Sequence, residues 1–157
     1  MNYTLNNKIC SSKFIKEEYF PIIIEFSSEE LNNRFIEFYF KDTDMFELSV
    51  NPETYELKRF SLTLCNHYSF EDGLLSLPEY VEGTIAIEGP LKTECSTFSV
   101  TVYNDGVYIK TSSDSPTVYI KCGNIIFSIA NNNELSSVLI VGLTDDEIAH
   151  VKTELTA

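Results

Sequence analysis

The sequence predicts an α+β fold that is predominantly antiparallel β, with twisted sheets and a C-terminal helix at about residues 145–155. Three observations lead to this prediction. Short apolar segments alternate with polar residues and are separated by Gly, Pro, Asn and Asp, as strands and turns are. An Asn-Asp-Gly turn at 104–106 joins two such segments, which is typical of a hairpin. Near the C-terminus the apolar residues change to helical spacing.

The expected strands follow one another along most of the chain. Asn51 and Pro52 begin a turn between two of them, Gly123 separates two others, and a helical turn is expected at 27–33, where Ser27 and Glu30 have capping-box spacing. The strand at 56–64 places Phe60, Leu62 and Leu64 on one face, as in a half-buried antiparallel strand. The strands cover residues 21–26, 34–40, 46–50, 56–64, 84–88, 97–103, 106–111, 117–122, 124–130 and 134–143.

The C-terminal helix has a complete set of local signals. Thr144 is a good N-cap, and Glu147 three residues later completes a capping box. Leu143 before the cap and Ile148 at the fourth helical position form a hydrophobic staple. The helix then has one apolar stripe to pack on a sheet, made of Ile148, Val151 and Leu155.

The middle of the chain, residues 66–83, is irregular. Gly73, Pro78 and Gly83 interrupt it, and Ser69 followed by Asp72 predicts a short helix that ends before Pro78.

Two segments, 45–65 and 124–143, have similar strand–turn–strand patterns. They suggest an internal duplication within one domain, residues 1–157, with halves 21–82 and 83–157. Chance is the alternative, because any hairpin alternates. Aligning Glu56 and Leu57 with Glu134 and Leu135 places Phe60 on Val138, Leu62 on Ile140 and Val50 near Ile129.

Charge limits the classes of partner. The chain has 24 acidic and 11 basic residues and a formal net charge of −13. Such a field repels phosphate backbones, whose binding depends on Lys and Arg, so we expect no nucleic-acid partner. It attracts basic proteins and speeds their encounter. An ordinary acidic protein would have the same charge, so charge alone identifies no partner.

Length and apolar runs limit the class further. The 157 residues suit one domain, which buries roughly two-thirds of the surface of the unfolded chain. Residues 1–20 lack the apolar region of a secretory signal, and the longest apolar runs are far shorter than the ~20 residues that cross a bilayer. We therefore expect a cytoplasmic protein without membrane contact.

No pattern predicts catalysis. His67 and His150 have no evident partner and are expected at the surface or its boundary, and the motifs of metalloproteases, serine hydrolases and nucleotide-binding proteins are absent. We expect no enzyme activity, no metal and no cofactor. The cysteines form no CxxC pair and lie in or beside apolar stretches, which predicts reduced, buried side chains: Cys10, Cys65, Cys95 and Cys122.

The irregular middle carries the best candidate for partner binding. Acidic residues alternate there with aromatic ones, and such a surface steers and anchors a basic protein. The alternative is a loop whose aromatic side chains pack into the core. The candidate residues are Tyr68, Glu71, Asp72, Glu79, Tyr80 and Glu82, with Asp42 and Asp44 in a hairpin turn as a second choice.

In size, acidity and β-rich texture the whole chain resembles the immunity proteins of bacterial toxin–immunity pairs, such as those of contact-dependent growth inhibition and other polymorphic toxins. The resemblance includes no diagnostic motif, so no functional residue is carried over. It implies a binding protein that neutralises a cognate, basic, nuclease-type toxin by occluding its site. The alternative is a β domain that binds a small ligand or serves as an accessory subunit, without catalysis.

Overall fold

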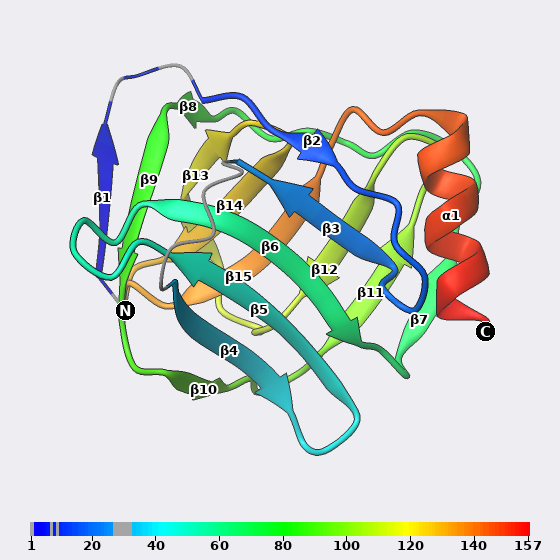
Figure 1. Cartoon of the computed structure of the whole chain (residues 1–157), viewed down its shortest axis with the longest axis horizontal. Coiled ribbons are helices and arrows are strands. Elements are labelled where there is room, and N and C mark those ends of the chain that lie inside the picture. Colours follow the sequence, from blue (N-terminus) through cyan, green and yellow to red (C-terminus); the bar gives the residue numbers. More distant parts are fainter. Residues whose placement is uncertain (1, 7, 9, 27–32) are drawn as a thin grey trace.

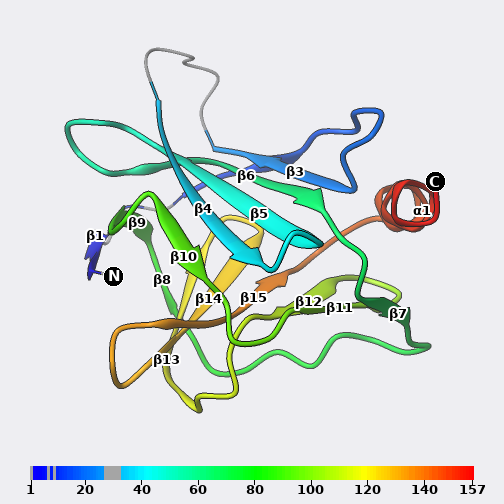
Figure 2. The ribbon, with the colours of Figure 1, turned by 90° about the horizontal axis from the view of Figure 1, so that it is seen from below.

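A computed structural model describes residues 2–6, 8, 10–26 and 33–157. In the described part of the chain, strands hold 51% of the residues and there is one helix, so the predicted β-rich α+β class is confirmed. Two large sheets pack face to face; a two-stranded sheet lies at one end of the molecule and α1 (Asp145–Leu155) at the other (Figures 1 and 2).

The first sheet has the strand order β10-β4-β5-β6-β3-β2. All neighbours are antiparallel except β10 and β4, which are parallel. Its strands are β2 (Lys13–Phe14), β3 (Ile22–Glu25), β4 (Arg34–Phe40), β5 (Asp44–Val50), β6 (Leu57–Leu64) and β10 (Lys92–Glu94).

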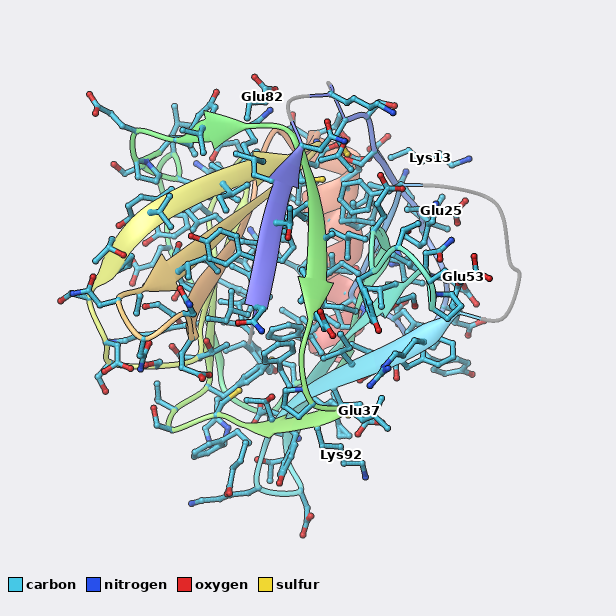
Figure 3. The ribbon with its side chains drawn as sticks, turned by 90° about the vertical axis from the view of Figure 1, so that its left-hand side faces the viewer. Lys13, Glu25, Glu37, Glu53, Glu82 and Lys92 are labelled. Carbon is cyan, nitrogen blue, oxygen red and sulfur yellow. The ribbon has the colours of Figure 1, made fainter. Side chains whose placement is uncertain are left out.

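The second sheet has the order β7-β11-β12-β15-β14-β13-β8, and its two edge strands, β7 and β8, run parallel to their neighbours. Its strands are β7 (Tyr68–Phe70), β8 (Val81–Glu82), β11 (Ser99–Val102), β12 (Val107–Lys110), β13 (Pro116–Cys122), β14 (Ile125–Ala130) and β15 (Leu135–Ile140). The two-stranded sheet pairs β1 (Asn2–Asn6) with β9 (Thr84–Glu88), seen side by side in Figure 3.

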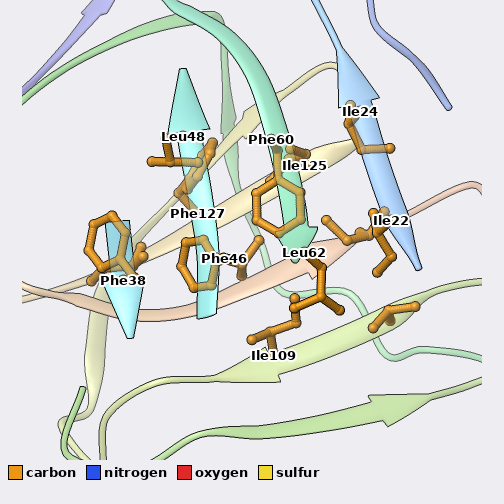
Figure 4. Packing of buried hydrophobic residues seen from close by; sticks show 14 of the residues in the cluster. Ile22, Ile24, Phe38, Phe46, Leu48, Phe60, Leu62, Ile109, Ile125 and Phe127 are labelled. Atoms are coloured by element: carbon orange, nitrogen blue, oxygen red, sulfur yellow. The ribbon is translucent and has the colours of Figure 1, made fainter. Parts of the chain in front are cut away.

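The core fills the space between the two large sheets. Figure 4 shows side chains of β3, β4, β5 and β6 facing those of β12 and β14. Phe46 is central: its ring lies 5.0 Å from that of Phe38 and 5.2 Å from that of Phe60. The predicted alternation along β6 holds for Phe60 and Leu62, which are fully buried, whereas Leu64 at the strand end is exposed.

The two sheets share one topology. In each, a strand is followed by a three-strand antiparallel meander whose last strand returns to pair with the first, a Greek-key arrangement. The order β4-β5-β6-β3 thus corresponds to β13-β14-β15-β12, and β2 and β11 extend the two sheets at the same position. A short parallel strand, β10 or β8, covers the opposite edge of each meander.

A β-bulge occurs at the same place in both sheets, and the register around it matches the alignment predicted from the sequence. The common origin of the two halves stays a prediction. The pairs beside the bulge are Val50–Leu57 and Ser49–Arg59 in the first sheet, and Ile129–Leu135 and Ser128–Ser137 in the second.

The C-terminal helix forms as predicted. The Thr144 side chain accepts a hydrogen bond from the backbone N–H of Glu147, whose side chain accepts one from the Thr144 N–H. Ile148, Val151 and Leu155 are buried and join the core of the two sheets.

The structure differs from two local predictions, and a third falls mostly outside the described residues. The prediction of a short helix that begins at Ser69 is wrong. Tyr68–Phe70 is instead an edge strand, parallel to β11. Pairing with a neighbouring strand outweighs a local capping pattern. Asp44 does not lie in a turn but begins β5. The helical turn at 27–33 falls mostly on residues outside the described part of the chain.

Two glycines give a matched test of packing around the turns. Gly123 and Gly142 both have positive φ, +58° and +66°. A Cβ on Gly142 meets its nearest neighbour, the Asn124 side chain, at 3.5 Å, whereas a Cβ on Gly123 would collide with the Ser12 side chain. We expect Gly142→Ala to cost about 1 kcal/mol from backbone strain alone, and Gly123→Ala about 2 kcal/mol. Chemical denaturation of both variants measures the difference; equal losses would contradict the packing of Ser12 on this turn.

Candidate partner-binding surface

Residues 71–80, here called the strap, cross the outer face of the second sheet. The strap begins after β7 at one edge of the sheet and ends at β8 on the other edge (Figure 2). Six inter-strand spacings separate the two edges, which places the ends of the strap about 29 Å apart.

The strap is anchored at its centre. Leu75 is buried against Ile126, Leu139 and Val141 on the outer face of the sheet. Its backbone N–H donates to a carboxylate oxygen of Asp105 at 2.8 Å. The strap is therefore positioned by contacts with strands far from it in sequence.

Most of the exposed large apolar side chains lie on the strap and the strands at its ends. Six of the ten in the described part of the chain are here, with exposed fractions between 38% and 72%. The alternative prediction, that the aromatic residues of this region pack into the core, is therefore wrong. The six are Tyr68, Phe70, Leu74, Leu77, Tyr80 and Val81.

Acidic side chains lie between these apolar ones. Glu71 and Asp72 follow β7, and Glu79 and Glu82 flank Tyr80; all four are exposed. Five of the predicted site residues lie on the strap or directly after it, in two groups at opposite edges of the sheet: Glu71, Asp72, Glu79, Tyr80 and Glu82. Tyr68 pairs with Val100, whose side chain faces the core, so its ring lies on the α1 side of the edge strand and borders a cavity with Glu154 and Leu155. The predicted residues therefore form a long strip that turns around this edge rather than one compact patch.

Each end of the strip already contacts a lysine of the same chain. The Lys152 ammonium of α1 lies 5.4 Å from the ring centre of Phe70. At the other edge the Lys121 ammonium lies 5.7 Å from the ring centre of Tyr80 and 3.5 Å from the carboxylate of Glu82. Both ends of the strip thus have a geometry that binds cations.

The second-choice residues do not join this surface. Asp42 is exposed in the turn between β4 and β5, on the first sheet. Asp44 is only 1% exposed, so the prediction that it contributes to a surface site is wrong. Its carboxylate is buried because it accepts four hydrogen bonds, from Thr43, Asn66 and His67.

The Asp44 carboxylate links two segments of the chain. One oxygen accepts hydrogen bonds from the backbone N–H groups of Asn66 and His67, at 2.8 and 3.2 Å. The other accepts from the Thr43 hydroxyl at 2.7 Å and from Nδ1 of His67 at 2.6 Å. Burial raises the pKa of Asp44, but the hydrogen bonds from Thr43, Asn66 and His67 outweigh it and leave the pKa below its usual value.

This arrangement positions β7, because Asp44 holds the two residues that precede it. His67, expected to lack a partner, is held by Asp44 and by the edge of the Phe40 ring. The thiol of Cys65 is nearby, and burial, followed by the Asp44 charge, raises its pKa to about 12, which favours the protonated thiol. His150 also has a partner, the backbone carbonyl of Phe20 at 2.9 Å.

The outer face of the first sheet is hollow and polar. A cavity of about 620 Å³ is lined by Glu47, Ser49, Arg59 and Ser61, with Phe35 at its border. Burial, followed by repulsion from Glu37, raises the pKa of Glu47. At the corresponding positions of the second sheet the strap covers apolar side chains, so the two outer faces differ in chemistry.

No protein-family model and no curated protein sequence matches this chain. Among the described residues there is no cluster of three or more His, Cys, Asp or Glu side chains that could hold a metal ion. The helix found in this part of the chain is too short and too polar to cross a membrane.

Proposed function

We propose that this protein binds a basic protein partner along the strap, and that the partner is a cognate nuclease-type toxin whose site the strap occludes. The observation that carries the proposal is the strip of exposed aromatic and aliphatic side chains interleaved with Glu71, Asp72, Glu79 and Glu82. In this proposal the protein acts in the cytoplasm as an immunity protein.

Charge and shape support the proposal for different reasons. A net charge of −13 accelerates the approach of a basic partner. Exposed aromatic rings supply the desolvated anchors that carry most of the affinity in protein interfaces. A strip about 29 Å long is comparable to a standard interface, which buries about 800 Å² on each partner. Nuclease sites hold phosphate, so carboxylates can occupy them.

The acidic strip should control the association rate. Reversing all four charges, Glu71→Lys, Asp72→Lys, Glu79→Lys and Glu82→Lys, is expected to slow association with the toxin at least tenfold at low salt, and added salt should slow association of the wild type. Surface plasmon resonance with the toxin captured from the native host measures this rate, and survival of toxin-expressing cells reports neutralisation.

A control variant changes the net charge by the same amount at positions away from the strap. It separates the effect of the charges on the strap from the effect of the net charge of the whole protein. Glu53 and Glu88 are exposed and lie away from the strap, so Glu53→Lys combined with Glu88→Lys can be compared with either pair on the strap, Glu71 and Asp72 or Glu79 and Glu82. Equal slowing by all three double variants, with full protection of cells, would rule out the strap as the contact surface.

The aromatic anchors should control dissociation. Tyr68→Ala and Tyr80→Ala are each expected to weaken binding by about 2 kcal/mol, roughly thirtyfold in Kd, because a true anchor fills a desolvated pocket of the partner. The dissociation rate is the readout. Phe35→Ala serves as a control, since Phe35 is exposed at the hollow of the first sheet, away from the strap. Unchanged dissociation in both Ala variants would show that the anchors lie elsewhere.

A second candidate function rests on the hollow of the first sheet. Its volume is suitable for a small ligand, and the buried Nε of Arg59 has no hydrogen-bond partner among the described residues. A ligand with an acceptor group would satisfy that donor. Native mass spectrometry of the protein purified from its host tests this function: an Arg59-dependent bound molecule would favour it, and a mass equal to that of the chain would not.

A further inference from the structure

Two of the four cysteines, distant in sequence, lie against each other. Cys10 lies in the segment between β1 and β2, and Cys122 is the last residue of β13. Figure 1 shows that the described chain leading into β2 runs beside the ends of β8 and β13. The two sulfur atoms are 2.9 Å apart, across 112 positions of sequence. No spacing pattern in the sequence indicates this pair.

Hydrogen bonds around the pair fix the segment in place. The Ser12 hydroxyl donates to the side-chain oxygen of Asn124 at 2.6 Å and accepts from the Asn124 backbone N–H at 2.7 Å. The Asn124 amide in turn donates to the carbonyl of Val141 at 2.9 Å. The two thiols are therefore held together by the surrounding fold and not by a chance contact of free side chains.

The two thiols differ in reactivity. The Cys122 thiol donates to the Cys10 sulfur, which lowers the pKa of Cys10 despite its burial and raises the pKa of Cys122. Cys10 is half-buried, whereas Cys122 is fully buried. Burial raises the pKa of both Cys65 and Cys95 to about 12. Cys10 is therefore the most readily ionised cysteine. Cys10 and Cys65 are both partly exposed, whereas Cys95 and Cys122 are buried, so Cys10 alone combines a lowered pKa with access for a reagent.

We propose that Cys10 and Cys122 form a reversible disulfide when the protein meets a low-molecular-weight disulfide such as oxidised glutathione. The Cys10 thiolate attacks one sulfur of the reagent, forms a mixed disulfide and releases one glutathione thiol. Cys122 then loses its proton and attacks the Cys10 sulfur, which releases the second thiol. Two cysteine thiols are oxidised and one glutathione disulfide is reduced to two thiols.

This disulfide acts on the fold independently of the proposed toxin binding. It joins the segment that carries β1 to the edge of the second sheet. A cross-link over so long a stretch of chain restricts the unfolded state strongly and stabilises the folded state. The N-terminal segment would detach from β13 more easily in the reduced protein than in the oxidised one.

Oxidation with glutathione, followed by peptide mapping without reduction, tests the proposal. In the wild type we expect one internal disulfide, between the peptides that contain Cys10 and Cys122, and a melting temperature about 8 °C above that of the reduced protein. A Cys65→Ser, Cys95→Ser double variant should keep both the disulfide and the shift, because those two residues take no part.

Single variants separate the steps. Cys122→Ser should stop at a glutathione adduct on Cys10, and Cys10→Ser should remain unmodified while folded, since Cys122 is buried. The proposal would be overturned if the folded wild type carried glutathione on Cys10 without closing to Cys122, if it stayed unmodified, or if the mapped disulfide involved Cys65 or Cys95. If a serine variant fails to fold, the double variant still decides between these outcomes.

Discussion

Replacing Val151 with Asp is expected to lower the free energy of unfolding by about 4 kcal/mol or more, enough to leave a large fraction of the protein unfolded at 37 °C. Val151 is fully buried where α1 packs on the two sheets. A carboxylate there would lose its water and find no cation, since the side chains around it belong to the apolar core. Ile148→Asp should behave similarly. Urea denaturation monitored by circular dichroism measures the free energy of unfolding of both variants.

The matched control lies on the opposite side of the same helix. Thr153 is exposed, and Thr and Asp have similar helix propensities, so Thr153→Asp should change the stability by no more than about 0.5 kcal/mol. If Val151→Asp unfolded at the same urea concentration as Thr153→Asp, the apolar stripe of α1 would not face a core.

The helix could be predicted because its determinants are local. Thr144 and Glu147 are three residues apart, and the stripe repeats within eleven residues, so one short window holds all the information. The short edge strands β2, β7, β8 and β10 could not be predicted. They contain two or three residues each and exist only because a longer strand lies next to them.

The repeated topology could be predicted in part from the sequence, because the apolar residues on the core-facing side of the first sheet recur at the same spacing in the second. Phe60 and Val138 each sit between two apolar neighbours on adjacent strands, and both alternate with side chains on the outer face. The outer faces have diverged: Glu47 corresponds to Ile126, and Ser61 corresponds to Leu139 by register around the bulge. The outer face of the second sheet is apolar and covered by the strap, whereas the outer face of the first sheet is polar. This difference obscures the similarity of the two halves in the sequence.

An ion pair shows the same divergence. Lys92 of β10 lies 3.7 Å from Glu37 of β4, and the corresponding strands of the second sheet place Glu82 3.5 Å from Lys121, with the charges exchanged. Figure 3 shows Glu37 and Lys92 together and Glu82 at the other end of the molecule. The two ion pairs occupy corresponding places in the two sheets, but the acidic and basic residues are exchanged. An alignment of the two halves by residue type would therefore miss a correspondence that the strand order shows.

The candidate surface was predictable in composition but not in shape. Acidic and aromatic residues that alternate within 68–82 mark a surface, yet only the sheet order shows that they span both edges. The pairs Asp44–His67 and Cys10–Cys122 were not predictable, because each joins residues that are distant in sequence and have no motif in common.

Asp44→Asn should cost about 3 kcal/mol, the second largest effect expected here. The substitution keeps the shape of the side chain but replaces one acceptor oxygen with an NH₂ group, which faces the donors of either Asn66 and His67 or Thr43 and His67. The turn before β7 would lose its anchor, and β7 is the edge strand at which the strap begins. Asp42→Asn, two residues away in the exposed turn between β4 and β5, is the control and should change stability by less than about 0.5 kcal/mol.

The pH dependence distinguishes this anchor from a simple loss of packing. The pKa of Asp44 is lower in the folded protein than its ordinary value of 3.8, so the carboxylate contributes stability above about pH 4 and that contribution disappears as the pH falls through the folded pKa. The Asn variant has no such group. The difference in unfolding free energy between wild type and Asp44→Asn should therefore be largest near neutral pH and narrow below about pH 4. A difference that stayed constant from pH 7 to pH 2 would mean that the ionised carboxylate does not hold the turn.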